Sequence, residues 1–334
     1  MSGNAQHPTT WVLTDGKAGT ENPCLALAEA MGVEPIVKRI SIRRPWAWLP
    51  PQFWLAPFSA IEPVGGRPQL APPWPDLLIA NGRPSVAPAL AIRRAAVGKT
   101  FAVQLQNPRV PPRRFDLVVA PRHDRLDGPN VLSTAGALHR VTPERLAQAA
   151  IAFEGMVKGL PRPLVAVMLG GPNRIYSFGL EEARRLAGQL AALARDRGVG
   201  LAITSSRRTP PEMVRAVRQA LVGLPFVFWD ASADTDKPNP YLGYLALADR
   251  ILVTSDSVSM ISEAAGTGKP VYVIGLAGGS KKFDRFHANM RETGAVRPFE
   301  GKLENWRYTP PDDTARAAAR VAAEMQKANA KQAR

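Results

Sequence analysis

The sequence predicts an α/β protein made of two doubly wound domains, each with a parallel sheet covered by helices on both faces. Short apolar runs of strand length alternate with longer stretches of helical periodicity, which is typical of parallel sheets. The alternation occurs twice, with a break rich in Pro and Gly, "KGLPRP", at residues 158–163. The 334 residues, of which 45% are hydrophobic, are enough for two cores.

The first domain is expected over residues 1–157 and begins with a strand, a glycine-bearing turn and a helix. Trp11, Val12 and Leu13 form the apolar run of this strand, and apolar residues then recur at near-helical spacing as far as Met31. Further strands are expected in "PDLLIANG", "TFAVQLQN" and "FDLVVAPR", with a helix in "VAPALAIRRAAVG".

The second domain is expected over residues 158–312 and repeats the pattern. Its strands are expected in "LVAVMLGG", "GLAITSS", "FVFWD", "RILVTSD" and "PVYVIGL", and its helices in "EEARRLAGQLAALARDRG" and "PEMVRAVRQAL". Residues 313–334 are expected to form a C-terminal helix that starts near Asp312 or Asp313, ends in basic residues and returns to the first domain.

Composition narrows the class of protein. The net charge of +15 suggests an anionic partner, although a solvated basic face is the alternative for the basic run at residues 81–125. No zinc spacing, RNA-binding signature or repeat points to nucleic acid. One cysteine, Cys24, fits a reducing compartment. The N-terminus shows no signal peptide, and no stretch approaches the roughly 20 apolar residues of a spanning helix. These features predict a cytoplasmic protein that binds anions.

Polar residues should gather just after the strands, because doubly wound domains bind ligands beyond the carboxyl ends of their strands. Two such domains in series are expected to face one another across a cleft. Polar segments do follow the predicted strands, at residues 15–21, 81–85, 106–109, 122–124, 170–174, 205–208 and 254–259.

The segment "TSDSVSMISEAAGTG", residues 254–268, has the most specific polar pattern. It leads from a strand into a helix whose first N–H groups suit a phosphate, with the Ser257 and Ser259 hydroxyls as further donors. Glu263 lies on the same helix face as Ser259 and is placed to accept hydrogen bonds from a ribose diol. The structural alternative is that a Ser or Asp caps the helix and Glu263 is an exposed helical residue.

Several blocks of the sequence resemble one family. Over about residues 10–312, they are similar to the family named for a plant mitochondrial-fission factor, the "elongated mitochondria" protein; the blocks are "DGKAGTENPCLALAEA", "NGRPSVAPALAIRR", "TFAVQLQNPR", "VTSDSVSMISEAAGTGKPVYV" and "KKFDRFHANMRETGAVRPFEG". "SEAAGTGKPVYVI" also resembles the donor-site helix of GT-B glycosyltransferases. The first loop is similar to that of the enzyme that adds N-acetylglucosamine to lipid-linked muramyl pentapeptide. The resemblance implies two Rossmann-like domains in a GT-B-like arrangement.

The resemblance also implies a nucleotide-diphosphate sugar as substrate, with no tightly bound cofactor and no metal ion. Glu263 would hold the ribose, while glycine backbone, hydroxyls and cations would bind the diphosphate. For His287 a purely structural role is the alternative. The expected nucleotide-sugar-binding residues are Gly170, Gly171, Asn173, Arg174, Ser205, Ser206, Arg207, Ser255, Asp256, Ser257, Ser259, Met260, Glu263, Lys282 and His287.

The first loop is expected to supply the catalytic base and to bind the acceptor. GT-B enzymes with such a loop often have a histidine after the glycines, where this chain has Thr20, so Asp15 or Glu21 would deprotonate the acceptor hydroxyl. Asp15 is preferred because it ends the first strand, although capping of the following turn explains it equally well. The residues expected on the acceptor side are Gly16, Lys17, Gly19, Asn81, Arg83 and Gln106.

The aromatic segment, "RRPWAWLPPQFWLAPF" at residues 43–58, combines five aromatic rings with two arginines. Its prolines exclude a regular spanning helix. Aromatic and basic residues together suit the surface of an anionic membrane, so we expect reversible attachment to the inner face of the cytoplasmic membrane. A loop that packs on the first domain, or a surface for a protein partner, is the alternative.

Three functions therefore fit the sequence. The first is a glycosyltransferase with a nucleotide-sugar donor and a lipid-linked or cell-envelope saccharide acceptor. The second is a GT-B-like scaffold without catalysis that recruits a partner protein to membranes. The third is a nucleotide-sugar epimerase, which also uses paired Rossmann-like domains but requires several acid and base groups near the sugar.

Overall fold

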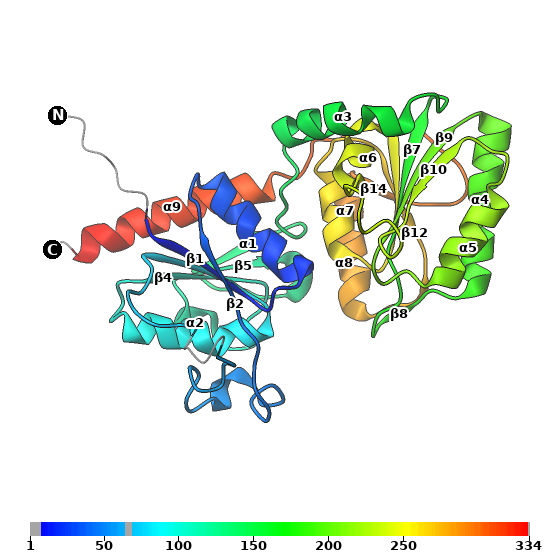
Figure 1. The fold of residues 1–334 in the computed structure, drawn as a ribbon. Helices are drawn as coiled ribbons and strands as arrows, with labels where there is room; N and C mark the ends of the chain where they lie inside the picture. The colour runs from blue at the N-terminus through cyan, green and yellow to red at the C-terminus, as the bar shows by residue number, and fades with distance from the viewer. Residues whose placement is uncertain (1–7, 64–68, 333–334) are drawn as a thin grey trace. The chain divides into compact units, whose positions relative to one another are not determined.

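The computed structural model of the protein describes residues 8–63 and 69–332 (Figure 1). The chain divides into two compact units, of which one comprises Met1–Arg140 with Asp312–Arg334 and the other Val141–Pro311. Among the described residues, each unit contains a six-stranded parallel sheet. The predicted α/β fold with two doubly wound domains is confirmed.

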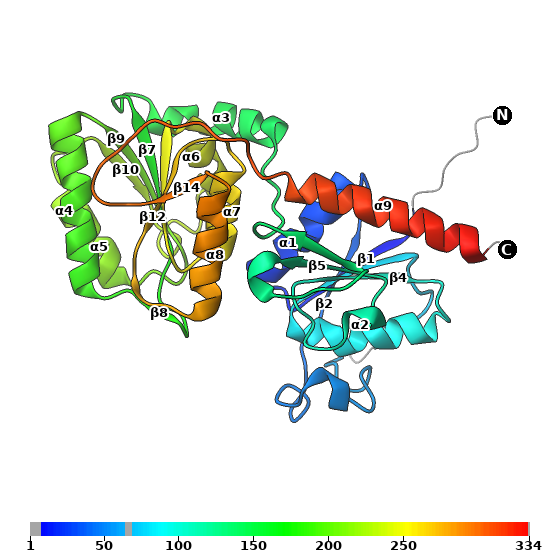
Figure 2. The same cartoon turned by 180° about the vertical axis from the view of Figure 1, so that it is seen from behind.

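The sheet of the first unit has the strand order β2-β1-β3-β4-β5-β6. Helix α2 covers one face, and α1 and α9 cover the other (Figures 1 and 2). The uninterrupted apolar runs have a physical cause, because the strands in the middle of the sheet are buried on both faces. The elements are β1 (Thr10–Thr14), α1 (Ala18–Ala30), β2 (Ile36–Arg39), β3 (Leu77–Asn81), α2 (Arg83–Ala95), β4 (Phe101–Leu105), β5 (Leu117–Pro121), β6 (Val131–Thr134) and α9 (Asp313–Gln332), with 3₁₀ turns at Pro51–Phe53, Pro112–Arg114 and Arg122–Asp124.

The C-terminal helix α9 belongs to the first unit, as the sequence predicted. Ala317 and Val321 are fully buried in the core beneath α1. At the start of α9, the Asp313 carboxylate accepts hydrogen bonds from the N–H groups of Ala135 at 2.7 Å and Gly136 at 3.2 Å. The chain therefore returns to the first unit after it has completed the second.

The sheet of the second unit has the strand order β10-β9-β7-β11-β12-β14. Helices α4 and α5 lie on one side of it and α6, α7 and α8 on the other (Figure 1). A short antiparallel pair, β8 with β13, lies outside the main sheet. The elements are α3 (Pro143–Val157), β7 (Leu164–Leu169), β8 (Tyr176–Ser177), α4 (Leu180–Arg197), β9 (Gly200–Ser205), α5 (Pro211–Ala220), β10 (Phe226–Trp229), α6 (Tyr241–Leu247), β11 (Arg250–Thr254), α7 (Val258–Ala265), β12 (Val271–Ile274), β13 (Ala277–Gly278), α8 (Lys281–Glu292) and β14 (Val296–Pro298).

The second unit begins at Val141, ahead of the boundary predicted after residue 157. The reason is that α3 packs on α6, where Phe153 lies against Gly243. A Cβ atom at Gly243 would come within 2.5 Å of the Phe153 Cβ, so the close contact of these two helices requires a glycine. Periodicity identifies α3 as a helix, but it does not reveal the unit on which the helix packs.

Candidate functional site

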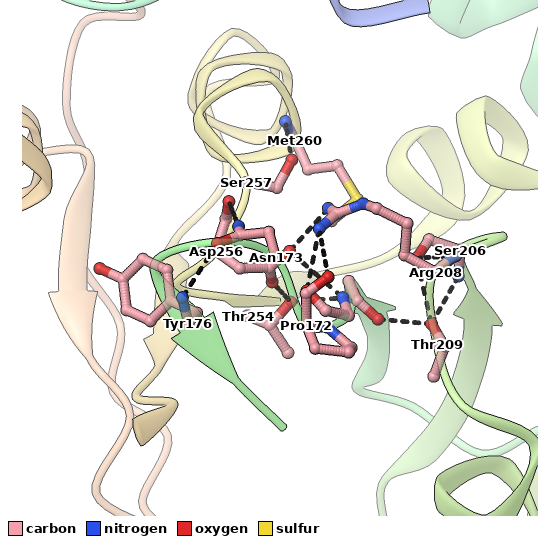
Figure 3. Close-up of polar contacts among 12 residues, drawn as sticks. Pro172, Asn173, Tyr176, Ser206, Arg208, Thr209, Thr254, Asp256, Ser257 and Met260 are labelled. Carbon is pink, nitrogen blue, oxygen red and sulfur yellow. Dashed lines mark hydrogen bonds and ion pairs between the residues drawn. The ribbon is translucent and has the colours of Figure 1, made fainter. Parts of the chain in front are cut away.

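In the second unit, the order of the strands reverses direction between β7 and β11. From β7 the chain continues outward through β9 and β10, and then returns to β11 and β12 on the other side of β7. Doubly wound sheets bind ligands beyond the carboxyl ends of the strands at such a switch point. The loops after β7, β9 and β11 contact one another there, and they contain most of the residues predicted to bind a nucleotide sugar (Figure 3).

Asp256 connects these three loops, and its side chain is completely buried. The carboxylate accepts hydrogen bonds from the Thr254 hydroxyl at 2.6 Å and from the Gly171 N–H at 3.2 Å. Arg208 reaches across from the β9 loop to form an ion pair with Asp256 at 2.7 Å, and it also donates to the Gly171 carbonyl at 2.9 Å (Figure 3). A buried carboxylate requires such partners, so this network fixes the loops to one another.

Two glycines after β7 make this close packing possible. A Cβ atom at Gly170 would lie 2.1 Å from the Asp256 Oδ1, and one at Gly171 would lie 2.2 Å from the Arg208 carbonyl oxygen. Asn173 closes the same loop, because its side-chain oxygen accepts backbone N–H groups two and three residues further on. Packing therefore explains both glycines, and their role towards a diphosphate stays a prediction.

The side chains predicted to bind phosphate differ in the hydrogen bonds that they already make within the protein. The hydroxyls of Ser205 and Ser255 are buried and bonded to neighbouring loops. The Ser206 hydroxyl is bonded within its own turn. Arg174 and Arg207 are exposed, and within the described residues neither makes a hydrogen bond or an ion pair. These two cations are the best placed of the set to meet an anionic ligand.

Helix α7 starts directly after the Asp256 loop. The Ser257 hydroxyl caps it by accepting a hydrogen bond from the Met260 N–H at 3.3 Å, which is the structural role given above as the alternative. Ser259 follows in the first turn and is partly buried. The sequence pattern identified this helix start correctly, but its binding of phosphate stays a prediction.

Glu263, one turn further along α7, is partly buried and accepts a hydrogen bond from the Tyr241 hydroxyl at 2.6 Å. Burial raises the pKa of Glu263 to about 7. Burial, together with the neighbouring Glu263, raises the pKa of Tyr241 well above its usual value, so this phenol remains a hydrogen-bond donor. Glu263 is thus not the freely exposed helical residue of the alternative interpretation, and sequence inspection missed Tyr241 as its partner.

His287 of α8 lies at the edge of the same site. Its Nε2 is 3.1 Å from the Ser255 carbonyl oxygen and 3.3 Å from the Tyr176 hydroxyl. Burial lowers the pKa of His287, so the ring is neutral at physiological pH and donates to the carbonyl. These three residues line a cavity of about 420 Å³. Lys282 is exposed near the start of α8.

In the first unit, the switch point lies between β1 and β3, and the loop after β1 carries Asp15. Asp15 accepts hydrogen bonds from the Thr20 hydroxyl at 2.5 Å and the Lys17 N–H at 3.3 Å, and pairs with the Lys17 ammonium. Burial raises the pKa of Asp15, but these bonds outweigh it and the net pKa is lowered. Glu21 is held by Arg39 through two bonds of 2.7 and 2.9 Å, which lower its pKa. Neither carboxylate has the raised pKa of a strong general base.

The other residues expected on the acceptor side mainly shape this loop. Gly16 has a φ of +75°, which favours glycine, whereas Gly19 lies within the first turn of α1. Asn81 is buried and donates to a carbonyl of that turn at 2.9 Å. Arg83 donates to two backbone carbonyls of the aromatic segment at 3.2 and 3.1 Å. Gln106 has a φ of 65°, a conformation that non-glycine residues seldom adopt.

The aromatic segment has a packed side and an exposed side. Trp54 is buried, with its ring 6.4 Å from that of Trp46. Trp48, Phe53 and Leu55 are 68%, 60% and 93% exposed. Such a cluster of exposed apolar side chains indicates an interaction surface.

Two kinds of feature are missing from the described part of the chain. No three or more His, Cys, Asp and Glu side chains within it are grouped so that they could hold a metal ion. Every helix in residues 8–63 and 69–332 is too short or too polar to cross a bilayer.

The fold and the strand-end loops define the chain as a GT-B-like α/β protein. Among solved structures, UDP-GlcNAc 2-epimerase from Methanocaldococcus jannaschii is similar with a TM-score of 0.59 and 12% identity, over 96% of this chain and 99% of that one. Os79 from O. sativa in complex with UDP is similar with a TM-score of 0.50 and 11% identity, over 95% and 94%. At these identities the likeness shows the fold alone.

The family follows from sequence comparison. The model of the family described as "Mitochondrial fission ELM1" matches residues 18–325, and the chain belongs to this family. Mitochondrial fission protein ELM1 of Arabidopsis thaliana is 37% identical over 278 residues, which are 75% of this chain and 64% of the plant protein. This chain therefore spans less than two thirds of that relative.

Proposed function

We propose that the protein is a GT-B-type glycosyltransferase that takes a nucleotide-diphosphate sugar and glycosylates a lipid-linked or cell-envelope saccharide. The observation that carries the proposal is the partly buried Glu263 carboxyl, one turn into the helix that starts at the switch point of the second unit. A carboxylate there suits a ribose diol, because both hydroxyls of the diol can donate to it. The GT-B-like fold supports the same class of ligand, because Os79 from O. sativa shares this fold and was solved in complex with UDP.

The remaining roles follow from the hydrogen-bonding groups and charges that each side chain still has available for a ligand. Arg207 and Arg174 would neutralise the diphosphate, together with the first N–H groups of α7. We assign the base to Asp15 rather than Glu21, because Glu21 is held on both oxygens by Arg39. An acceptor hydroxyl would take the place of the Thr20 hydroxyl on Asp15.

Substitution of Glu263 tests the donor site. Glu263→Ala is expected to weaken binding of the nucleotide sugar by about 1.5–3 kcal/mol, the range for hydrogen bonds to a charged group. Calorimetric titration with UDP, GDP, ADP and CMP sugars measures this. Glu181→Ala, which removes an exposed carboxylate from α4, is the matched control and should bind as the wild type does. If the wild type binds none of these sugars, the glycosyltransferase hypothesis is refuted, and the GT-B-like scaffold without catalysis remains.

We further propose that the exposed side of the aromatic segment attaches the protein to an anionic membrane. Trp48, Phe53 and Leu55 would enter the headgroup region, while Arg43 and Arg44 meet anionic lipid, each contributing about 1 kcal/mol. Both arginines are exposed, and the Arg44 guanidinium lies 5.4 Å from the centroid of the Trp48 ring. Attachment at this surface would bring the first unit to a lipid-linked acceptor.

Vesicle co-sedimentation tests the attachment. Replacing Trp48, Phe53 and Leu55 together by serine is expected to reduce binding to anionic vesicles at least tenfold, because burial of one such side chain contributes about 1.5 kcal/mol or more. Ile151→Ser with Val222→Ser removes apolar residues that are 81% and 78% exposed in the second unit, and should change nothing. If the wild type does not co-sediment with anionic vesicles at low salt, the aromatic segment does not bind membranes.

A further inference from the structure

A second groove lies at the opposite end of the sheet in the second unit. Its volume is about 1030 Å³, and its lining comes from the residues that precede or begin β7, β11 and β12 and from the segment after β14: Arg162, Pro163, Asp249, Arg250, Pro270, Asn305, Trp306 and Arg307. Parallel strands all run the same way, so these strand starts lie away from the Asp256 loops at the strand ends. The six residues of β7 separate the two ends by about 20 Å.

The groove carries an excess of positive charge. Three arginines face one acidic residue, Asp249, in its lining. One oxygen of the Asp249 carboxylate already accepts hydrogen bonds from Arg162 at 2.9 Å and from the Leu164 N–H at 2.6 Å. Arg250 and Arg307 are therefore not neutralised by the acid beside them.

Many guanidinium donors in the groove are unused. A guanidinium has five N–H groups. Arg162 donates through Nη1 to the Leu247 carbonyl at 2.8 Å and to the Asp249 carboxylate at 2.9 Å. Arg250 donates through Nε to the Glu304 carbonyl at 3.2 Å and through Nη2 to the side-chain oxygen of Asn305. Arg307 is exposed and bonds to none of the described residues. Two anchored arginines and one unengaged arginine thus offer donors to an anion.

The groove also has an apolar part. Trp306 is held in place by the hydrogen bond from its Nε1 to the Gly294 carbonyl at 2.9 Å and by the edge contact with Tyr272 at 5.0 Å, and the Arg297 guanidinium lies over its ring at 4.4 Å from the centroid. Pro163 and Pro270 add apolar surface. The groove is open to solvent and is wider than a bare phosphate ion requires, so it has room for an organic molecule. Arginines beside a fixed aromatic ring suit a ligand with a phosphate group and a ring.

We propose that this groove is a second ligand site, distinct from the nucleotide-sugar site, and that it binds a small phosphorylated organic molecule with a ring. The ligand's phosphate meets Arg307 and Arg250, and its ring lies against Pro163 and Pro270 beside Trp306, whose ring already carries Arg297. The proposal rests on the groove alone and holds whether or not the strand-end loops bind a nucleotide sugar.

Phenyl phosphate and inorganic phosphate are the probes, titrated at low salt and followed by ligand-observed NMR. Phenyl phosphate is expected to bind more tightly than phosphate. Arg307→Ala is expected to raise its Kd at least fivefold without loss of stability, because Arg307 makes no hydrogen bond or ion pair with the described residues. Arg195→Ala removes an exposed arginine from α4 in the same unit and should leave the Kd within twofold.

Three outcomes would overturn the proposal. The first is that phenyl phosphate does not bind. The second is that its Kd is the same in Arg307→Ala and Arg195→Ala. The third is that Arg307→Ala weakens binding of an Asp- and Glu-rich hexapeptide but not of phenyl phosphate, which would make the groove a peptide site.

Discussion

Arg208→Ala is expected to lower the free energy of unfolding of the protein by about 3 kcal/mol. The substitution leaves the Asp256 carboxylate, whose side chain is 0% exposed, without its cation. The Thr254 hydroxyl and the Gly171 N–H still donate to it, but they do not neutralise its charge. The loss is expected to be smaller than for a fully buried pair, because the Arg208 side chain is itself 43% exposed and water partly screens its charge. Urea unfolding at neutral pH measures the effect.

The neighbouring arginine is the matched control. Arg207→Ala removes the same charge one residue earlier, from a side chain that is exposed and bonds to none of the described residues, and should change stability by less than about 0.5 kcal/mol. Asp256→Asn in the Arg208→Ala background removes the unpaired charge and should recover part of the loss. Equal stability of the two single arginine variants would show that the ion pair does not hold these loops together.

The fold was predictable because buried parallel strands leave a simple pattern. "LVAVML" is apolar throughout and "LLIAN" is apolar up to its last residue, Asn81, and all residues of β3 and β7 are indeed buried. The pair β8–β13 could not be predicted, because two residues per strand carry no periodicity. The packing of α3 on α6 was equally hidden, since it depends on Phe153 meeting Gly243, which is 90 residues further along the chain.

The candidate site was predictable only for residues whose place in the fold follows from their place in the sequence. Polar residues after strands mark the site, so Asp256 and Glu263 were found. The choice between Arg207 and Arg208 depends on the backbone of one turn, and nothing in "SSRRT" distinguishes the two. Tyr241 lies 22 residues before Glu263 on another helix, so only the folded structure pairs them. A buried carboxylate always needs partners, and that requirement was the available signal.

Glu263 is expected to make the protein less stable as the pH rises from about 4.5 to about 7. Its pKa is 4.5 in the unfolded chain and about 7 in the folded protein. Between these values the folded state holds a proton that the unfolded state has released, so the free energy of unfolding falls with pH, by about 3 kcal/mol in all. Below 4.5 and above 7 this contribution is constant. Groups such as Asp15, whose pKa is lowered in the folded protein, make the free energy of unfolding rise with pH, and they do so at lower pH.

Comparison with Glu263→Gln isolates this contribution. The glutamine variant cannot titrate, so its stability relative to the wild type should rise by about 3 kcal/mol between pH 4.5 and 7.5 and then stay level. Tyr241→Phe removes the hydrogen bond that favours the charged carboxylate, and should move the end of the transition to higher pH. A stability difference that does not vary with pH would mean that Glu263 is ionised throughout.

The same titration governs binding if Glu263 holds a ribose. The two hydroxyls of a diol donate to the carboxylate and favour its ionised form, so binding of the nucleotide sugar should release a proton near pH 7. Its Kd is therefore expected to fall about fivefold from pH 6 to pH 7 and to level off above about pH 8. In Glu263→Gln the Kd should be weaker and should lose this dependence. Calorimetry in buffers of different ionisation enthalpy counts the released proton. A wild-type Kd that is constant from pH 5.5 to 8 would show that the Glu263 carboxylate does not accept hydrogen bonds from the ligand.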